Sequence, residues 1–149
     1  MPIRCEIVSQ DRMVFEGDAD MVIVPGILGE MGILPKHAPL LSTLNIGILK
    51  VRTQGREEHF TVSGGVIEVQ PDLITILADA AENVQEIDVA RAEAAKRRVE
   101  ELLAQGPGRE TDNYMELEAA LKRSSLRLDA VKRFRGQQRG YQGRSQEES

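Results

Sequence analysis

The stretch GILKVRTQGREEHFTVSGGVIEVQPDLITILAD, residues 47–79, decides the fold of this chain. It holds three or four runs rich in strand-forming residues. The segments TQGR, SGG and QPD separate these runs, and each contains residues that favour turns. The runs are short and have no helical period. Short strands at this spacing predict an antiparallel β-sandwich or flattened barrel.

The residues before this stretch continue the same pattern. The segment IRCEIVS alternates, so that Ile3, Cys5 and Ile7 would share one face of a strand. The segment ADMVIVPG is a short apolar run that ends at Pro-Gly. We therefore predict a β-sandwich domain over residues 1–85. Because Cys5 is the only cysteine, no internal disulfide can form, which favours a reducing compartment.

The pattern changes after residue 79. Asp88 suits the N-cap of a helix, and the run VARAEAAKRRVEELLAQ that follows is rich in strong helix formers. The segment GPG, residues 106–108, would end this helix, and a second helix would run from residues 111–113 to about residue 135. A short connection predicts an antiparallel helical hairpin over residues 86–135. The remaining residues, 136–149, lack apolar periodicity and predict a flexible tail.

The apolar stripe of this hairpin is lean. A fully buried Leu or Val contributes about 1.5–3 kcal/mol, whereas ordering a residue costs about 1–2 kcal/mol. We therefore expect the hairpin to be held by a modest margin. The stripe consists of small and aliphatic residues interrupted by Ser124: Ala92, Ala95, Val99, Leu102, Leu117, Leu121, Leu128 and Val131.

Charge divides the chain at the same place. Residues 1–87 hold 6 Lys/Arg against 13 Asp/Glu, whereas residues 88–149 hold 13 against 11. This asymmetry indicates two parts with different partners. No apolar run approaches the roughly 18–20 residues of a membrane span, and the N-terminus has no signal-peptide pattern, so we expect no direct membrane insertion.

Catalytic and metal-binding motifs do not emerge from the sequence. Two histidines and one cysteine supply no metal-ligand cluster, and SGG at residues 63–65 lacks the GxSxG pattern of a nucleophile elbow, so we do not expect an enzyme. The segment PGILGEMGILPKHAPLL, residues 25–41, lacks a GxGxxG fingerprint, and we interpret its glycines and prolines as shaping irregular loops between strands. His37 has no acidic or cysteine partner nearby in sequence, which favours a structural or interface role.

The basic segment 122–144 is the main electrostatic feature. Like charges four residues apart on a helix, such as Arg123 and Arg127, repel each other by a few tenths of a kcal/mol. Either these side chains are solvated, or an anion or acidic partner offsets the repulsion. The segment contains one acid, Asp129, among eight basic residues: Lys122, Arg123, Arg127, Lys132, Arg133, Arg135, Arg139 and Arg144.

A second group of arginines lies on the first predicted helix. Arg91 and Arg98 are two turns apart on one face, and Asp88 lies one turn earlier. In an antiparallel hairpin, the arginines of the second helix could approach them, and several guanidinium groups around one point would bind a polyphosphate. Asp88 and Glu82 could accept hydrogen bonds from a base or hold the arginines in place. The alternative is an ordinary helix start.

Four segments together resemble the epsilon subunit of the bacterial F-type rotary ATP synthase. They are GEMGILPKHAPLLSTLNIGILKV, SGGVIEVQPDLITILAD, IDVARA, and ALKR with Arg127 after it, and the resemblance spans about residues 2–134. It implies an N-terminal β-sandwich, a C-terminal helix hairpin and a non-catalytic role in the central stalk of a proton-translocating complex. Such a protein is peripheral, on the cytoplasmic face of the bacterial inner membrane.

The resemblance also implies partners. The sandwich would bind the gamma subunit and the c-ring, with Glu30, Met31 and His37 at this rotor contact. The hairpin would either fold beside the sandwich or extend into the alpha/beta catalytic hexamer, where it blocks ATP hydrolysis. The basic second helix would then meet acidic surfaces there.

In some bacterial members the folded hairpin binds ATP. This chain keeps that motif at Ile87, Asp88, Arg91 and Ala92. It also matches at four further charged positions: Glu82, Arg98, Arg123 and Arg127. The resemblance therefore implies a regulatory ATP site, whereas no cofactor is expected to be required.

Two rival functions remain. The chain could be a constitutive coupler whose hairpin never switches, or a nucleic-acid binder that uses residues 122–144. The net charge of −5 and the 3% aromatic content argue against a nucleic-acid partner.

Overall fold

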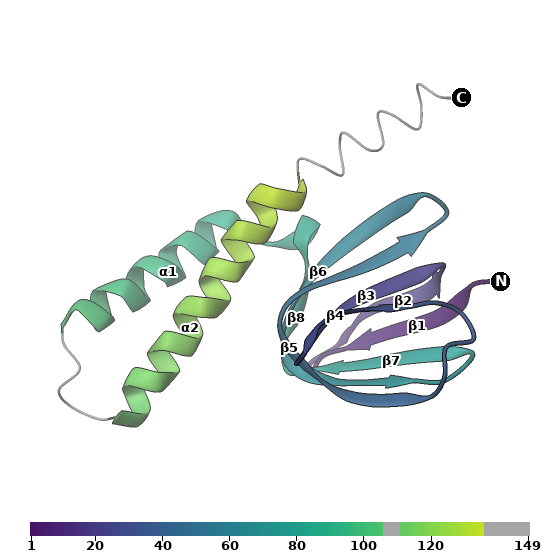
Figure 1. Cartoon of the computed structure of the whole chain (residues 1–149). Coiled ribbons are helices and arrows are strands. Elements are labelled where there is room, and N and C mark those ends of the chain that lie inside the picture. The colour runs from purple at the N-terminus through teal and green to yellow at the C-terminus, as the bar shows by residue number, and fades with distance from the viewer. Residues whose placement is uncertain (106–110, 136–149) are drawn as a thin grey trace, which may run out of the picture.

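The structure, a computed structural model, describes residues 1–105 and 111–135. It consists of a β-sandwich beside a two-helix hairpin (Figure 1). The predicted helix stop at residues 106–108 and the predicted tail at residues 136–149 lie outside the described residues. The eight strands are β1 (Ile3–Val8), β2 (Met13–Ala19), β3 (Met21–Gly26), β4 (Gly29–Ile33), β5 (Leu40–Thr53), β6 (Arg56–Val69), β7 (Leu73–Ala78) and β8 (Ala81–Asn83).

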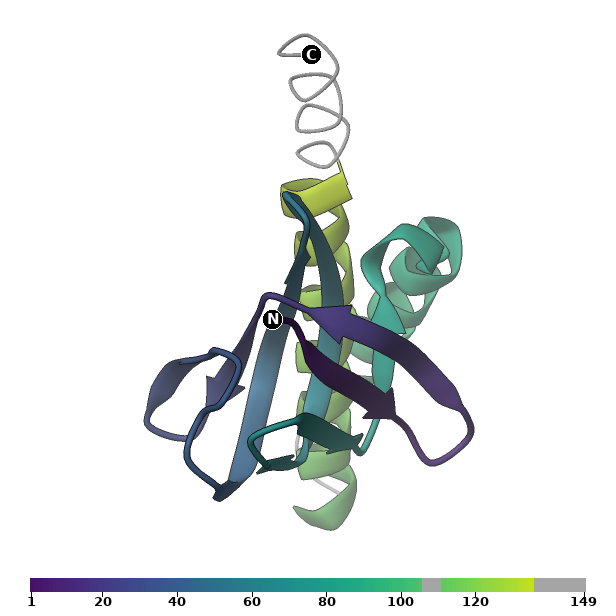
Figure 2. The ribbon, with the colours of Figure 1, turned by 90° about the vertical axis from the view of Figure 1, so that its right-hand side faces the viewer.

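The strands are hydrogen-bonded in the order β2-β1-β7-β6-β5-β3-β4, and β8 pairs with β6. The pair β1–β7 is parallel and the remaining pairs are antiparallel. Figure 2 views these strands from the side opposite the hairpin. The predicted fold class, a sandwich followed by an antiparallel hairpin, is confirmed.

Alternating strand residues build the main core. Ile3, Cys5 and Ile7 are at most 1% exposed, so the predicted inward face of β1 is confirmed. Phe15 packs edge-to-face on the fully buried Phe60, with ring centroids 5.6 Å apart. Burial, with a smaller effect of the neighbouring carboxylate of Glu6, raises the pKa of the Cys5 thiol to about 12.

The predicted break at SGG is wrong. Strand β6 continues through these residues and pairs with β8 before them and with β7 from Gly65 onward. Gly64 and Gly65 have φ values of +98° and +128°, which glycine adopts at no steric cost. A Cβ on Gly65 would lie 2.2 Å from the carbonyl oxygen of Leu77. The two glycines therefore bend one long strand and allow the neighbouring backbone to approach it.

The interpretation of residues 25–41 as irregular loops holds only in part. Residues Gly29–Ile33 form strand β4, which pairs antiparallel with β3. The chain turns between these two strands at Ile27 and Leu28, which are 60% and 102% exposed. The stretch GEMGI thus extends the sheet, and its last residue, Ile33, is buried in the core.

The helical part follows the predicted plan. A 3₁₀ turn, η1 (Val84–Glu86), leads into α1 (Val89–Ala104), and α2 (Thr111–Ala130) ends in a π-helical turn, η2 (Val131–Arg135). Asp88 is the N-cap of α1, and its carboxylate accepts a hydrogen bond of 3.0 Å from the backbone N–H of Arg91. The two helices pack antiparallel (Figure 1). No helix within residues 1–105 and 111–135 is long and apolar enough to cross a membrane.

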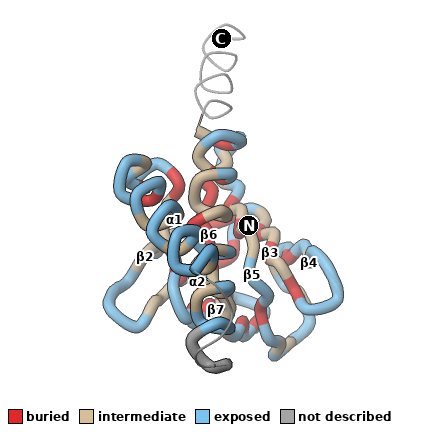
Figure 3. Tube along the Cα trace, turned by 90° about the vertical axis from the view of Figure 1, so that its left-hand side faces the viewer, coloured by how far each residue is buried: buried red, intermediate tan, exposed pale blue. Residues whose placement is uncertain are grey.

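The hairpin docks mainly through its second helix. Helix α1 packs on α2, and α2 with η2 contacts β5, β6 and η1. A small second cluster of buried residues forms there, from Val84, Ile87, Ala130 and Phe134. Figure 3 shows that most of α1 is exposed, and Ala92 is its one buried residue. The main core of the sandwich, in contrast, consists of residues from its strands, and no buried residue in the described part of the hairpin belongs to it.

Candidate nucleotide site and docking interface

A cavity of 320 Å³ lies between the hairpin and the sandwich. This volume is at the lower end of the roughly 300–1,000 Å³ typical of small-molecule pockets. The sandwich side contributes Thr61, Ser63, Ala80, Ala81 and Glu82, and the helices contribute Ala95, Val99, Ala120, Arg123, Ser124, Leu126 and Arg127. The pocket is apolar toward α1 and carries its charges where α2 meets β8.

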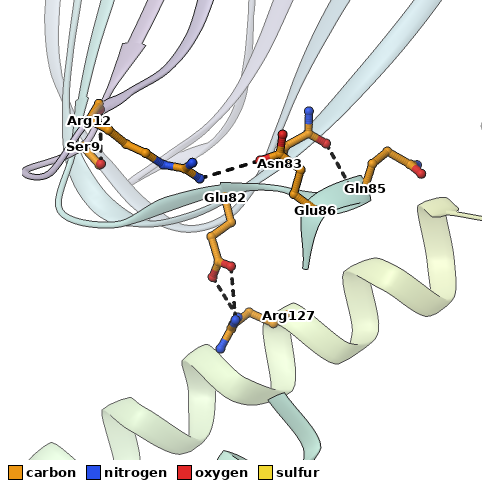
Figure 4. A network of polar contacts seen from close by, with 7 residues as sticks. All are labelled: Ser9, Arg12, Glu82, Asn83, Gln85, Glu86 and Arg127. Atoms are coloured by element: carbon orange, nitrogen blue, oxygen red, sulfur yellow. Dashed lines mark hydrogen bonds and ion pairs between the residues drawn. The ribbon is translucent and has the colours of Figure 1, made fainter. Parts of the chain in front are cut away.

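An ion pair between Glu82 and Arg127 joins β8 to α2 at this cavity. Arg127 Nη2 donates to Glu82 Oε2 at 3.1 Å, and Arg127 Nε lies 2.8 Å from Glu82 Oε1. The two side chains point toward each other across the interface in Figure 4. The side chain of Arg127 is 23% exposed and that of Glu82 is 35% exposed, so the pair is more shielded from solvent than a surface salt bridge. The contact both holds α2 and occupies the carboxylate.

Three of the seven predicted nucleotide-site residues line the cavity: Glu82, Arg123 and Arg127. Arg91 and Arg98 are exposed on α1 and lie outside its lining. Of the three or four guanidinium groups predicted to meet at one point, only those of Arg123 and Arg127 line the cavity in this conformation.

Two further residues of the predicted site have structural roles on α1. Ala92 is fully buried, which allows close packing of the helix. Asp88 caps the helix and, through this bond, fixes the backbone of Arg91. The motif IDVARA thus forms a helix start at the edge of the docking interface.

The predicted rotor-contact residues lie at a different place. Glu30 and Met31 are in β4, opposite Pro25 and Val24 of β3. Met31 is half-buried and packs against the core, whereas Glu30 is exposed. His37 follows β4, and its ring Nδ1–H donates to the Ala38 carbonyl at 2.7 Å. Glu30 and Met31 therefore lie next to the exposed turn between β3 and β4, whereas His37 follows the other end of β4.

An aromatic contact at the docking interface has no counterpart among the predicted residues. The ring of Phe134, in η2, stacks on that of His59 of β6, with centroids 4.1 Å apart and an interplanar angle of 19°. Both residues are buried, at 5% and 4% exposure. Phe134 lies three residues after Val131, the last member of the predicted stripe, and this spacing is the signal that could have identified it.

Arg135 completes this contact. Its Nη2 donates to the carbonyl oxygens of Val84 and Ile87, at 2.7 and 2.8 Å. Those carbonyls belong to η1 and to the residue after it, immediately before α1. The last turn of the hairpin is thus hydrogen-bonded to the segment that connects the sandwich to α1, and this contact helps to hold the hairpin against the sandwich.

His59 also belongs to a charged cluster on β5 and β6. Its Nε2 lies 2.7 Å from Glu57 Oε1, and Glu57 Oε2 accepts from Arg52 at 2.6 Å. Burial lowers the pKa of His59, and Lys50 adds to this, whereas Glu57 only partly offsets it. Although burial acts to raise it, the hydrogen bonds from Arg52 and His59 hold the pKa of Glu57 below its ordinary value.

A larger hollow of 1260 Å³ surrounds the turn between β5 and β6. It reaches His59 and Gln85, but its lining includes none of the predicted nucleotide or rotor residues. Acidic and basic side chains mix along its wall, among them Asp18, Asp20 and Arg52. This mixed wall does not define a ligand class, so we consider the smaller cavity to be the candidate nucleotide site.

The fold and its two parts define a class of protein. Residues 2–84 match the family described as ATP synthase, Delta/Epsilon chain, beta-sandwich domain, and residues 85–132 match the corresponding long alpha-helix domain. The chain belongs to the delta/epsilon chain family of ATP synthase.

Similar proteins within this family include epsilon chains. The chain is 52% identical over 101 residues to the ATP synthase epsilon chain of Pelotomaculum thermopropionicum, which covers 68% of this chain and 75% of that one. It is 42% identical over 139 residues to that of Dehalococcoides mccartyi, with 89% and 94% covered. The resemblance to the epsilon subunit is therefore confirmed.

Solved structures share the fold. A chain of the mitochondrial ATP synthase of Euglena gracilis aligns with a TM-score of 0.71 at 22% identity, over 87% of this chain and 81% of that one. A chain of the Tetrahymena thermophila mitochondrial enzyme, from its central stalk and c-ring, aligns with a TM-score of 0.55 at 13% identity, over 88% and 97%.

Proposed function

We propose that this chain is a non-catalytic central-stalk subunit of the proton-translocating ATP synthase, and that its hairpin regulates ATP hydrolysis. Family membership supports the stalk role. The observation that carries the regulatory role is the separation of the hairpin from the main core. A part that is attached through one small cluster can detach while the sandwich stays folded.

The sandwich has a surface suited to the gamma subunit. Four apolar residues are cross-strand neighbours over β2, β1, β7 and β6: Met13, Val8, Leu77 and Val66. Met13, Leu77 and Val66 are 47%, 55% and 39% exposed. A contiguous apolar row on an exposed sheet face is typical of a protein interface. We infer that gamma covers this row.

The turn between β3 and β4 suits the c-ring contact. Ile27 and Leu28 project there, next to Glu30 and Met31. In this arrangement the subunit is peripheral and lies on the cytoplasmic face of the bacterial inner membrane. Its contacts with the membrane sector go through the c-ring.

ATP sensing would use the cavity between hairpin and sandwich. A nucleotide phosphate near Arg123 and Arg127 would have to compete with Glu82 for the Arg127 guanidinium. Because the lining brings only two arginines together, ATP binding would also draw Arg91 toward the cavity. A ligand at a hundred times its dissociation constant stabilises the state that binds it by about 2.7 kcal/mol, which can shift two states a few kcal/mol apart.

The same arginines would serve the extended state. Released from Glu82, Arg127 would join Arg123 in facing acidic side chains of the alpha/beta catalytic hexamer. Each conformation of the hairpin would therefore satisfy the charges with a different partner. Charge reversal at both arginines should weaken both ATP binding and inhibition. A variant that loses only one of these two functions would contradict the shared role.

Removal of the hairpin tests the regulatory function. In the assembled ATP synthase, a chain that ends at Ile87 is expected to raise the rate of ATP hydrolysis, because no helices remain to enter the hexamer. The main core keeps all its residues in this variant. The measurement is the steady-state hydrolysis rate of complexes that contain the full chain or the shortened one. Equal rates would favour the rival function, a constitutive coupler.

ATP binding tests the sensor. Calorimetry on the isolated full chain is expected to detect binding, and Arg127→Ala should abolish it because this residue lines the cavity. Arg91→Ala should abolish it only if α1 rearranges. Lys132→Ala, a basic residue of η2 outside the cavity lining, is the matched control and should bind like the wild type. The absence of heat at millimolar ATP would leave IDVARA as a helix start with no nucleotide role.

A further inference from the structure

The contact between His59 and Phe134 places a titratable group under the last turn of the hairpin. His59 points outward from β6, because its neighbour Phe60 belongs to the core. An outward residue of a sandwich is ordinarily solvated. His59 is 4% exposed because the ring of Phe134 stacks on it at 4.1 Å. Docking of the hairpin therefore removes an imidazole from water.

The hydrogen bonds of His59 define its protonation state in the docked hairpin. Nε2 faces the carboxylate of Glu57 at 2.7 Å, so this nitrogen carries the proton and donates it. Nδ1 is buried and has no hydrogen-bond partner among the described residues. Protonation would add an N–H at Nδ1 that meets no acceptor, and an unsatisfied buried donor disfavours the state that contains it.

Charges on three neighbouring elements act on this imidazole. Glu57 of β6 favours its protonation, but Arg52 of β5 shares that carboxylate. Lys50 of β5 is directly opposite His59, and its Nζ lies 5.5 Å from the centroid of the Phe134 ring. The guanidinium of Arg133, in η2, lies 5.2 Å from the same centroid. A charged His59 would thus be the third cation around one aromatic ring.

Segment η1 packs against this site as well. It contributes Glu86, which is exposed and pairs with Arg12 at 3.7 Å. Next to it, the guanidinium of Arg135 is bonded to the carbonyls of Val84 and Ile87. These groups do not offer Nδ1 an acceptor. Burial, the missing partner at Nδ1 and the two nearby cations all act in one direction.

We propose that protonation of His59 releases the last turn of the hairpin from the sandwich, so that hairpin docking depends on pH. This inference rests on the proposed function in one respect, namely that the hairpin leaves the sandwich in the working subunit. In the released state Phe134 moves away, water reaches Nδ1, and the protonated imidazole is solvated. A fall in pH would therefore increase the population available to inhibit ATP hydrolysis.

The direction follows from proton linkage. Docking lowers the pKa of His59, chiefly through burial, so the docked state binds the proton more weakly than the released state. Docking has its full stability above the ordinary histidine pKa of about 6.5 and loses stability as the pH falls from there to the pKa in the docked state. A single proton changes the docking equilibrium by at most about tenfold per pH unit.

The first test is an NMR titration of the full chain. The sequence contains two histidines, so the ring signals of His37 and His59 can be followed together. His59 is expected to titrate at lower pH in the wild type than in Phe134→Ala, where nothing covers its ring. Tyr114→Ala changes an exposed aromatic residue of the same helix and should leave the His59 titration unchanged. An equal or higher midpoint in the wild type would overturn the proposal.

The second test measures docking directly. Dyes on Asp72→Cys and Met115→Cys, both exposed, report the distance between sandwich and hairpin, whereas the buried thiol of Cys5 stays unlabelled. The urea concentration that separates the dyes is expected to decrease when the pH is lowered from about 7.5 to about 5.5, two values on either side of the ordinary histidine pKa. His37→Gln should keep this dependence and His59→Gln should reduce it. Equal dependence in both would contradict the proposal.

These tests use the isolated chain. A hairpin truncation that leaves ATP hydrolysis unchanged would refute the proposed regulatory function and would not alter either titration. Conversely, a titration in which His59 ignores Phe134 would refute the pH dependence and leave the stalk role intact.

Discussion

Gly65→Ala is expected to destabilise the sandwich by more than about 4 kcal/mol, a loss exceptional for a single substitution. The new methyl group would lie 2.2 Å from the carbonyl oxygen of Leu77 and 2.8 Å from the Cα atom of Ala78. Both atoms are backbone, so neither can rotate away. Relief requires that β6 and β7 separate, and five paired residues on each strand hold them together. Urea unfolding followed by circular dichroism measures the effect.

Gly29→Ala is the matched control for this substitution. Gly29 has a φ of +127°, nearly the same as the +128° of Gly65, but a Cβ there meets no atom within 4 Å. This variant therefore isolates backbone strain, which costs about 1–3 kcal/mol. If the two variants lose equal stability, the close approach at Gly65 is not the reason for its glycine.

Phe134→Ala is expected to detach the hairpin and leave the sandwich folded. Truncation of a buried Phe costs about 3–5 kcal/mol, and Phe134 is the largest residue of the docking cluster. Helices of this length are marginal when they pack on nothing. The expected result is loss of amide protection in α2 and η2, while the amides of β6 and β7 exchange as in the wild type.

Two comparisons make this result specific. Tyr114→Ala removes an aromatic ring from the same helix at a position that is 39% exposed, and its amide protection should resemble that of the wild type. Arg135→Ala removes the two bonds to η1 and should produce a smaller loss than Phe134→Ala. Protection of α2 in Phe134→Ala at the wild-type level would mean that the other docking contacts, such as the pair of Glu82 and Arg127, are enough to hold the hairpin.

The sandwich could be predicted because its information is local. Alternation along Ile3, Cys5 and Ile7 identifies an inward face before any partner strand is known. The same local reading failed at Gly64 and Gly65, since glycines with positive φ occur both in turns and in bent strands. Only the pairing of β6 with β8 before these glycines and with β7 from Gly65 onward distinguishes the bent strand from a turn.

The docking interface could be predicted only in part, because it depends on which segments meet. Glu82 and Arg127 were identified from the family motif, and they do form a pair. His59 has the sequence environment of a polar residue on a solvated face. Its burial follows from the arrival of Phe134, 75 positions later in the chain, and no pattern around either residue indicates the other.

The parallel pair of β1 and β7 determines when this protein can fold during synthesis. Strand β1 emerges first from the ribosome, but its pairing with residues 73–77 must wait until nearly the whole sandwich has been made. Long-range strand pairing of this kind is slow to nucleate. The nascent chain thus completes its core late. Residues 86–135 follow the sandwich in the chain, so the strands on which the hairpin docks are synthesised before it.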